Sequence, residues 1–230
     1  MLRIKNCRIC ISFLLLLWLP GWSCSAQKGT NINDPVAGEI LDRVAKKYQG
    51  QALDIDFTLT TVRPKLKPDE PDAKYTTNEN GKLLLKGKRF RIIFGGHEVV
   101  CDGKNIWTYA QSAKEAQLNE YDENEETFSP SKIFSLHQSG YSYQIKEKKN
   151  FQGKNVTVIE LSPANRKVSF FKIDIAVEDG TNTVLESKVY EKNGVRYIYK
   201  INKAFPSSAT DADFVFDTKS HPGVKVVDLR

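Results

Sequence analysis

The sequence predicts a mainly β protein of about ten or eleven antiparallel strands with two helical segments. Three observations predict this class. Apolar and polar residues alternate at period two along most of the chain, turn residues separate the alternating runs, and helical spacing is confined to two segments. A sheet with this many strands tends to curl, because twist accumulates from strand to strand.

The segment from Gly81 to Tyr109 carries the clearest strand signal. Its apolar residues recur at period two, and lysines and arginines occupy positions between them. We expect the tight turn at Asp102-Gly103 to fix the register of the strands around it. The residues expected on the apolar face are Leu83, Leu85, Phe90, Ile92, Phe94, Val99, Trp107 and Tyr109.

Further strands are expected on both sides of this segment. Apolar and polar residues alternate in a first strand at 54–61, which includes Phe57 and has one solvent-exposed face. Residues 64–72 interrupt the pattern and are expected to form an exposed loop. Residues 113–117 resemble the tip of a hairpin. The remaining strands are expected at 141–147, 155–161, 170–177, 184–191, 195–202 and 214–216.

Two segments show helical spacing. Asp34 can cap the first, Pro35 fits its first turn, and the pattern ends near Gly50. Ser129-Pro130 starts a second, shorter segment, which we expect to lie over the sheet as a helix. The apolar stripes of the two segments include Ile40, Val44, Ile133, Phe134 and Leu136.

The first 26 residues are typical of a secretory signal peptide. Three basic residues precede an apolar run at 11–19, which is shorter than the roughly 20 residues of a membrane span, and small residues follow it. Lipidation of Cys24 is an alternative, but the bulky Trp22 favours cleavage after Ala26. We therefore expect a single mature domain at 27–230 in an exported protein.

Charge and cysteine content limit the possible functions. Cleavage after Ala26 removes three basic residues and no acidic ones, so the formal net charge falls from +6 to +3. Basic residues are dispersed rather than clustered, which argues against a nucleic-acid partner. Cys101 is the one cysteine left, so no intramolecular disulfide forms. Within an apolar strand it is expected to be buried, with a reactive thiol as the alternative.

The expected mature sequence contains no recognised catalytic or metal-binding motif. His97, His137 and His221 lie far apart and lack the spacing of a zinc helix, and there is no nucleophile elbow or phosphate loop. The acidic run at 122–126 lacks the alternation of a calcium loop. A triad can still assemble in space. We nevertheless expect a protein without catalytic residues, metal or cofactor.

The apolar face of the predicted sheet must be shielded from water by other elements. Two short helices fill such a concavity poorly, which suggests a hollow core. Composition alone nevertheless favours side chains that interdigitate completely and leave no cavity.

The chain resembles the LolA family of outer-membrane lipoprotein carriers over nearly the whole mature sequence. Four motifs carry the resemblance by their order and spacing. They are ILDR at 40–43 with DFT at 56–58, GKL at 81–83 with FR at 90–91, DGKNIWTY at 102–109, and FVF at 214–216 with PGVKVVD at 222–228. Related lipid-binding proteins, including the acceptor LolB and a periplasmic stress sensor, share the architecture.

The resemblance implies an unclosed antiparallel β-barrel, covered by a helical lid, whose hydrophobic cavity takes the acyl chains of lipoproteins. It also implies a periplasmic, monomeric, non-enzymatic carrier between an inner-membrane release complex and an outer-membrane acceptor. The alternative is a lipid-sensing adaptor of the same fold that binds a membrane regulator. The expected cavity wall is Phe57, Leu59, Leu83, Leu85, Phe90, Ile92, Phe94, Trp107, Tyr109, Phe171 and Ile173, and the expected lid residues are Ile40, Val44, Ile133, Phe134 and Leu136.

One departure from the family concerns the lid. Family members commonly carry a Lys-Arg-Pro run whose arginine holds the lid closed over the empty cavity. This chain has Lys86-Gly87-Lys88 at that place. Arg89 and Arg91 are the nearest alternatives, but the resemblance does not assign the role to either.

Overall fold

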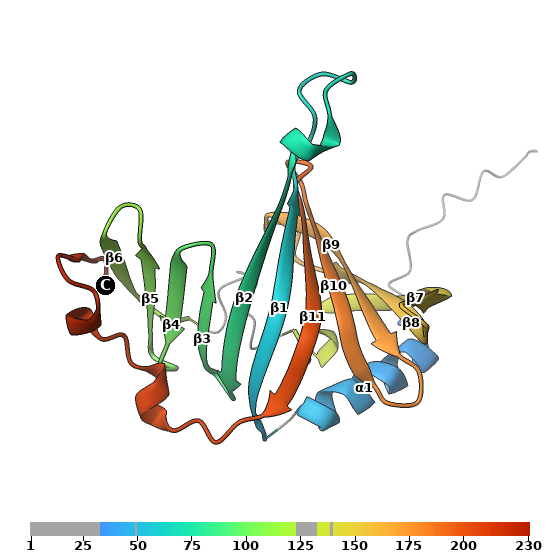
Figure 1. The fold of residues 1–230 in the computed structure, drawn as a ribbon. Coiled ribbons are helices and arrows are strands. Elements are labelled where there is room, and N and C mark those ends of the chain that lie inside the picture. Colours follow the sequence, from blue (N-terminus) through green and yellow to red (C-terminus); the bar gives the residue numbers. More distant parts are fainter. Residues whose placement is uncertain (1–32, 49, 123–132, 139) are drawn as a thin grey trace, which may run out of the picture. The chain divides into compact units, whose positions relative to one another are not determined.

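The computed structural model describes residues 33–48, 50–122, 133–138 and 140–230, all within one compact unit at 31–230. The predicted signal peptide and the predicted helix start at Ser129-Pro130 lie outside these residues. Twelve strands of the described part form one sheet (Figure 1). They are β1 (Ala52–Val62), β2 (Thr76–Lys86), β3 (Arg89–Phe94), β4 (His97–Cys101), β5 (Asn105–Ala110), β6 (Glu115–Glu120), β7 (Tyr141–Phe151), β8 (Lys154–Pro163), β9 (Phe170–Glu178), β10 (Thr183–Glu191), β11 (Arg196–Pro206) and β12 (Lys225–Asp228).

The sheet is unclosed and almost wholly antiparallel. Its order is β12-β6-β5-β4-β3-β2-β1-β11-β10-β9-β8-β7, so β12 and β7 are its two edges. Among the strands that the structure describes, only the β12–β6 pair is parallel. The predicted mainly β, unclosed architecture is confirmed, with one more strand than the upper expected number.

The helix α1 (Pro35–Tyr48) begins and ends where the sequence predicts. The Asp34 carboxylate accepts hydrogen bonds from the backbone N–H groups of Val36 at 2.9 Å and Ala37 at 3.3 Å, which caps the first turn. Its other oxygen accepts from the Ile145 N–H at 3.3 Å, so the cap also ties the helix to β7.

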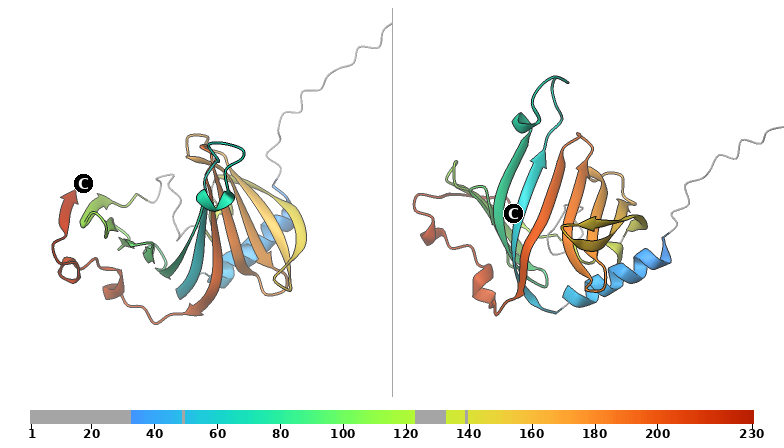
Figure 2. Two further views of the ribbon diagram at one scale, coloured as in Figure 1. Left: turned by 45° about the horizontal axis from the view of Figure 1, so that its top comes forward. Right: turned by 45° about the vertical axis from the view of Figure 1, so that its right-hand side comes forward.

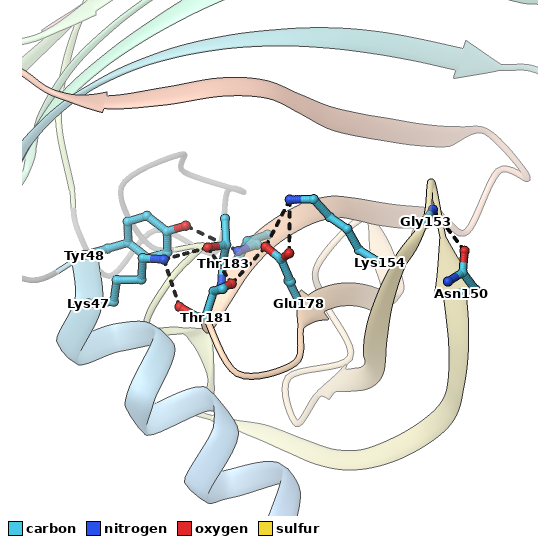
Figure 3. A network of polar contacts seen from close by, with 9 residues as sticks. Lys47, Tyr48, Asn150, Gly153, Lys154, Glu178, Thr181 and Thr183 are labelled. Atoms are coloured by element: carbon cyan, nitrogen blue, oxygen red, sulfur yellow. Dashed lines mark hydrogen bonds and ion pairs between the residues drawn. The ribbon is translucent and has the colours of Figure 1, made fainter.

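The last turn of α1 is fixed to the connection between β9 and β10 (Figure 3). Lys47 Nζ donates to the Thr181 carbonyl at 2.9 Å and to Thr183 Oγ1 at 2.6 Å. The Tyr48 hydroxyl accepts from the Val184 N–H at 3.3 Å. Both ends of the helix are therefore held against the β7–β10 half of the sheet, as Figures 1 and 2 show.

The main hydrophobic core lies between α1 and the face of the sheet that we call the inner face. Leu41, Val44 and Tyr48 of the helix are buried there. The second predicted lid helix is only partly described. Ile133–Ser135 form a turn and Leu136–Gln138 a 3-10 helix, and Phe134 stacks on Tyr48 with ring centroids 4.1 Å apart.

A C-terminal segment, residues 207–230, runs along the opposite, outer face toward β6 (Figure 2). The strand predicted at 214–216 is wrong. Phe214 ends a 3-10 helix, Asp211–Phe214, and the last strand is instead β12. The alternation arises because Phe214 and Phe216 are both buried while Val215 is 57% exposed, without a paired strand. No helix among the described residues is long and apolar enough to cross a membrane.

Candidate functional site

An apolar cavity of about 240 Å³ lies on the inner face of the sheet. Strands β1 to β5 supply most of its wall, β10 and β11 supply one end, and the turn at Ile133–Ser135 contributes two side chains. It is lined by Ile55, Phe57, Leu83, Phe90, Ile92, Val99, Ile106, Ile133, Phe134, Ser187, Tyr199 and Ile201.

The position of the Phe57 side chain in the cavity depends on a glycine on the neighbouring strand. Phe57 on β1 pairs with Gly81 on β2. A Cβ atom placed on Gly81 would lie 2.3 Å from Phe57 Cζ, which is closer than any side chain allows. The ring therefore lies over the Gly81 backbone, and the absence of a side chain at Gly81 makes room for it.

The structure brings most of the predicted site residues to the inner face. The predicted residues that line the cavity are Phe57, Leu83, Phe90, Ile92, Ile133 and Phe134. A second group belongs to the surrounding core without lining the cavity. It consists of Leu59, Leu85, Ile173, Val44 and Leu136, which are buried, and Ile40 and Phe94, which pack against them from partly buried positions.

Trp107 and Tyr109 lie on the outer face, so their predicted place in the wall is corrected. Cys101 pairs directly with Ile106 across the turn between β4 and β5. Residues 102–105 separate the two, so the odd-numbered Cys101 is paired with the even-numbered Ile106. Paired residues point to the same face of a sheet, and Cys101 belongs to the inner core. The inner positions of β5 are therefore even-numbered, and Ile106 takes the place expected for Trp107.

Phe171 is also corrected, because its side chain is 51% exposed. The pairing of β9 with β10 is interrupted here: Tyr190 pairs with Lys172 and Glu191 with Phe170, which leaves Phe171 as the extra residue of a β-bulge. Phe170 is buried in its place. The Phe171 ring lies 6.2 Å from that of Tyr190, outside the core.

Ser187 is a lining residue that the sequence analysis did not identify, and Tyr199 lines the cavity beside it. They are direct neighbours on β10 and β11. Burial raises the pKa of Tyr199 to about 12, so its hydroxyl stays protonated at neutral pH. A signal for Ser187 exists, because it alternates with Glu186 and Lys188 in phase with the buried Val189.

The outer face of β2–β6 binds the C-terminal segment. Arg89 forms an ion pair with Asp211, and Arg91 Nη2 donates to the Val215 carbonyl at 2.7 Å. Within the part of the chain that the structure describes, these arginines therefore contact the C-terminal segment and not the lid residues. Gly87 occupies the β2–β3 turn with φ of +59°, a conformation that favours glycine.

Two of the three histidines of the predicted mature chain lie in separate places. His137 Nε2 is 2.9 Å from Asp42 Oδ1, and His221 Nε2 is 2.9 Å from Glu98 Oε2. Among the residues that the structure describes, no group of three or more potential ligands could hold a metal ion. Cys101 is completely buried, and burial raises the pKa of its thiol.

Comparisons with known proteins agree with this architecture. A family model described as outer membrane lipoprotein carrier protein LolA matches residues 52–217. No protein of curated function matches the chain.

Among solved structures, an uncharacterized conserved protein from Thermus thermophilus superposes with a TM-score of 0.54 at 13% identity, over 84% of this chain and 99% of that one. A LolA superfamily protein from Nitrosomonas europaea gives 0.45 at 13% identity, over 79% and 98%. The Pseudomonas aeruginosa MucA/MucB complex gives 0.37 at 11% identity, over 80% and 62%.

Proposed function

Because the chain belongs to the LolA family of outer membrane lipoprotein carrier proteins, we propose that it binds the acyl chains of lipoproteins in the inner-face cavity. It would act in the periplasm as a monomer. It would receive lipoproteins from a release complex of the inner membrane and deliver them to an acceptor at the outer membrane. No covalent step is required for this cycle.

The observation that supports the proposal is the apolar lining of the cavity. Ten of the twelve lining side chains are purely hydrocarbon, the other two are Ser187 and Tyr199, and no charged side chain is among them. An acyl chain exposed to water costs about 0.8 kcal/mol for each methylene. A soluble carrier must therefore replace the membrane with an apolar wall, and this cavity supplies one.

We infer that the cavity opens when a ligand enters it. Its volume of about 240 Å³ is below the roughly 300 to 1,000 Å³ of typical ligand pockets. Phe134 closes it on one side and is 7% exposed. It is held by the ring of Tyr48 and by core contacts. Withdrawal of this side chain from the cavity would enlarge it while the sheet stays intact.

The proposal is tested with Phe90→Glu, which places a carboxylate in the cavity wall. We expect that the variant no longer releases lipoproteins from inner-membrane vesicles, because an acyl chain bound beside a carboxylate would remove that charge from water. The control is Ile93→Glu on the same strand. Ile93 faces the outside and is 46% exposed, so this variant should release lipoproteins normally.

A second variant keeps the test valid if Phe90→Glu does not fold. Val99→Phe fills the cavity without adding charge, and circular dichroism checks the fold of each protein. Normal release by a folded Phe90→Glu or Val99→Phe protein would contradict the proposal. Capture of a membrane regulator, without uptake of lipoproteins by the wild type, would favour the adaptor function instead.

A further inference from the structure

The cavity has one polar end. Ser187 on β10 lines it, and its side chain is 1% exposed. Among the residues that the structure describes, no group forms a hydrogen bond with Ser187 Oγ. Its cross-strand neighbour Tyr199 lines the same end. The cavity thus combines a long apolar wall on β1–β5 with a hydroxyl at the β10–β11 end.

A buried hydroxyl without a partner is unfavourable, because it has lost its hydrogen bonds to water. Thr157 is an example of a buried hydroxyl that has a partner in this protein. It is also 1% exposed, and its Oγ1 donates to Asp179 Oδ1 at 2.8 Å. Alanine at position 187 would fill nearly the same space without this cost. The hydroxyl of Ser187 is therefore better explained by a partner that enters the cavity than by packing.

We propose that Ser187 donates a hydrogen bond to the ester or amide carbonyl oxygen at the head of a bound acyl chain. The chain then lies with its carbonyl at β10–β11 and its hydrocarbon tail along β1–β5. This inference rests on the proposed function and names the part of the ligand that the cavity recognises.

The lining also selects between kinds of acyl head group. Among the residues that the structure describes, no lysine, arginine or histidine lines the cavity, so these residues offer no countercharge to a buried ionised carboxylate. A neutral ester or amide needs only one donor, and Ser187 supplies it. The cavity should thus favour acyl esters and amides over free fatty acids of equal length.

The test compares two probes of equal length, a long-chain fatty acid methyl ester and the corresponding alkane, by displacement of a fluorescent acyl probe. We expect Ser187→Ala to weaken binding of the ester about fivefold, the effect of one hydrogen bond of ordinary strength, and to leave the alkane unchanged. Ser187→Thr keeps the hydroxyl and should retain ester binding. Ile201→Val, a neighbouring apolar change, should affect both probes alike.

The outcomes separate this inference from the function on which it rests. If the wild type binds neither probe, the proposed function fails. If both probes bind and Ser187→Ala shifts them equally, or leaves the ester unchanged, Ser187 has another partner such as a water molecule and the inference is overturned.

Lipoproteins and phospholipids carry the same ester carbonyl, so a second experiment is needed to determine which of the two the cavity binds. A triacylated lipopeptide and a diacyl phospholipid are compared as competitors. Stronger competition by the lipopeptide assigns the site to lipoproteins, and stronger competition by the phospholipid assigns it to membrane lipid. With either source, sensitivity of the better competitor to Ser187→Ala supports the carbonyl contact, and insensitivity contradicts it.

Discussion

Trp107 and Phe216 stack on the outer face of the sheet, with ring centroids 5.0 Å apart and planes inclined by 17°. Trp107 belongs to β5, and Phe216 to the C-terminal segment. Together with the buried Val100 and Ala116 they form a small second core. This core lies on the other side of the sheet from the cavity, so the C-terminal segment is held by its own hydrophobic contacts.

From the stacked pair we predict that a substitution in the second core lowers the stability of the protein without changing its affinity for acyl chains. Phe216→Ala should lower the free energy of unfolding by roughly 3 to 5 kcal/mol, because a phenyl ring that is 6% exposed is removed from a packed site. Urea denaturation measures the loss. Val215→Ala, at a side chain that is 57% exposed, is the matched control and should change stability by at most about 0.5 kcal/mol.

Affinity for acyl probes should stay at the wild-type value in both variants, measured under conditions where both are folded. The separation of the two faces would be contradicted if Phe216→Ala weakened acyl binding as much as a change in the cavity wall. It would also be contradicted if the substitution left the free energy of unfolding unchanged.

The contact between Gly81 and Phe57 predicts a coupled effect. Gly81→Ala should destabilise the protein by about 1 to 3 kcal/mol, because the added methyl group forces the Phe57 ring out of its place. Phe57 lines the cavity, so displacement of its ring should weaken acyl binding as well. Denaturation and probe displacement measure the two effects on the same samples.

Phe57→Leu supplies the control for this coupling. A smaller side chain at position 57 leaves room for the methyl group, so Gly81→Ala should cost less in the Phe57→Leu background than alone. The double-mutant cycle measures the difference. If the losses of unfolding free energy of the two single variants simply add in the double variant, the Phe57 ring is not the reason that position 81 requires glycine.

Local patterns predicted much of this fold. The cap at Asp34 and the helical spacing after it depend on neighbouring residues, so α1 was correctly bounded. The inner faces of β2 and β3 were also correctly assigned, because Leu83 and Phe90 lie within uninterrupted alternation. In such segments the period alone fixes which side chains share a face.

Register was not predictable where the count of residues in a turn or bulge decides it. One extra residue reverses every side chain that follows, and this reversal moved Trp107 to the outer face. The bulge at Phe171 has the same effect within a strand. Ser187 was missed for a different reason, because a small polar residue is compatible with either face and only its phase relative to Val189 indicates burial.

Tyr199 predicts a loss of stability in alkali. Burial raises the pKa of its hydroxyl to about 12, and Coulombic interactions with Tyr197 and Glu191 act in the same direction. The unfolded chain releases this proton near pH 10. Because the folded pKa is the higher one, the stabilising contribution is complete below about pH 10 and is lost as the pH rises toward 12.

Tyr199→Phe isolates this contribution, because phenylalanine keeps the ring and removes the ionisable group. The free energy of unfolding of the wild type should fall more steeply between pH 10 and 12 than that of the variant. Tyr190, on the outer face, also has its pKa raised to about 12, by burial and by its contact with Asp174. Tyr190→Phe should flatten the profile independently, because the two residues lie on opposite faces.

Ligand binding distinguishes the two tyrosines. Ionisation of Tyr199 places a negative charge in the cavity, so acyl affinity of the wild type and of Tyr190→Phe should fall over the same pH range. The affinity of Tyr199→Phe should fall less. Parallel decline in all three proteins would show that Tyr199 does not face the ligand, whereas a decline that Tyr199→Phe alone escapes would place its hydroxyl beside the bound chain.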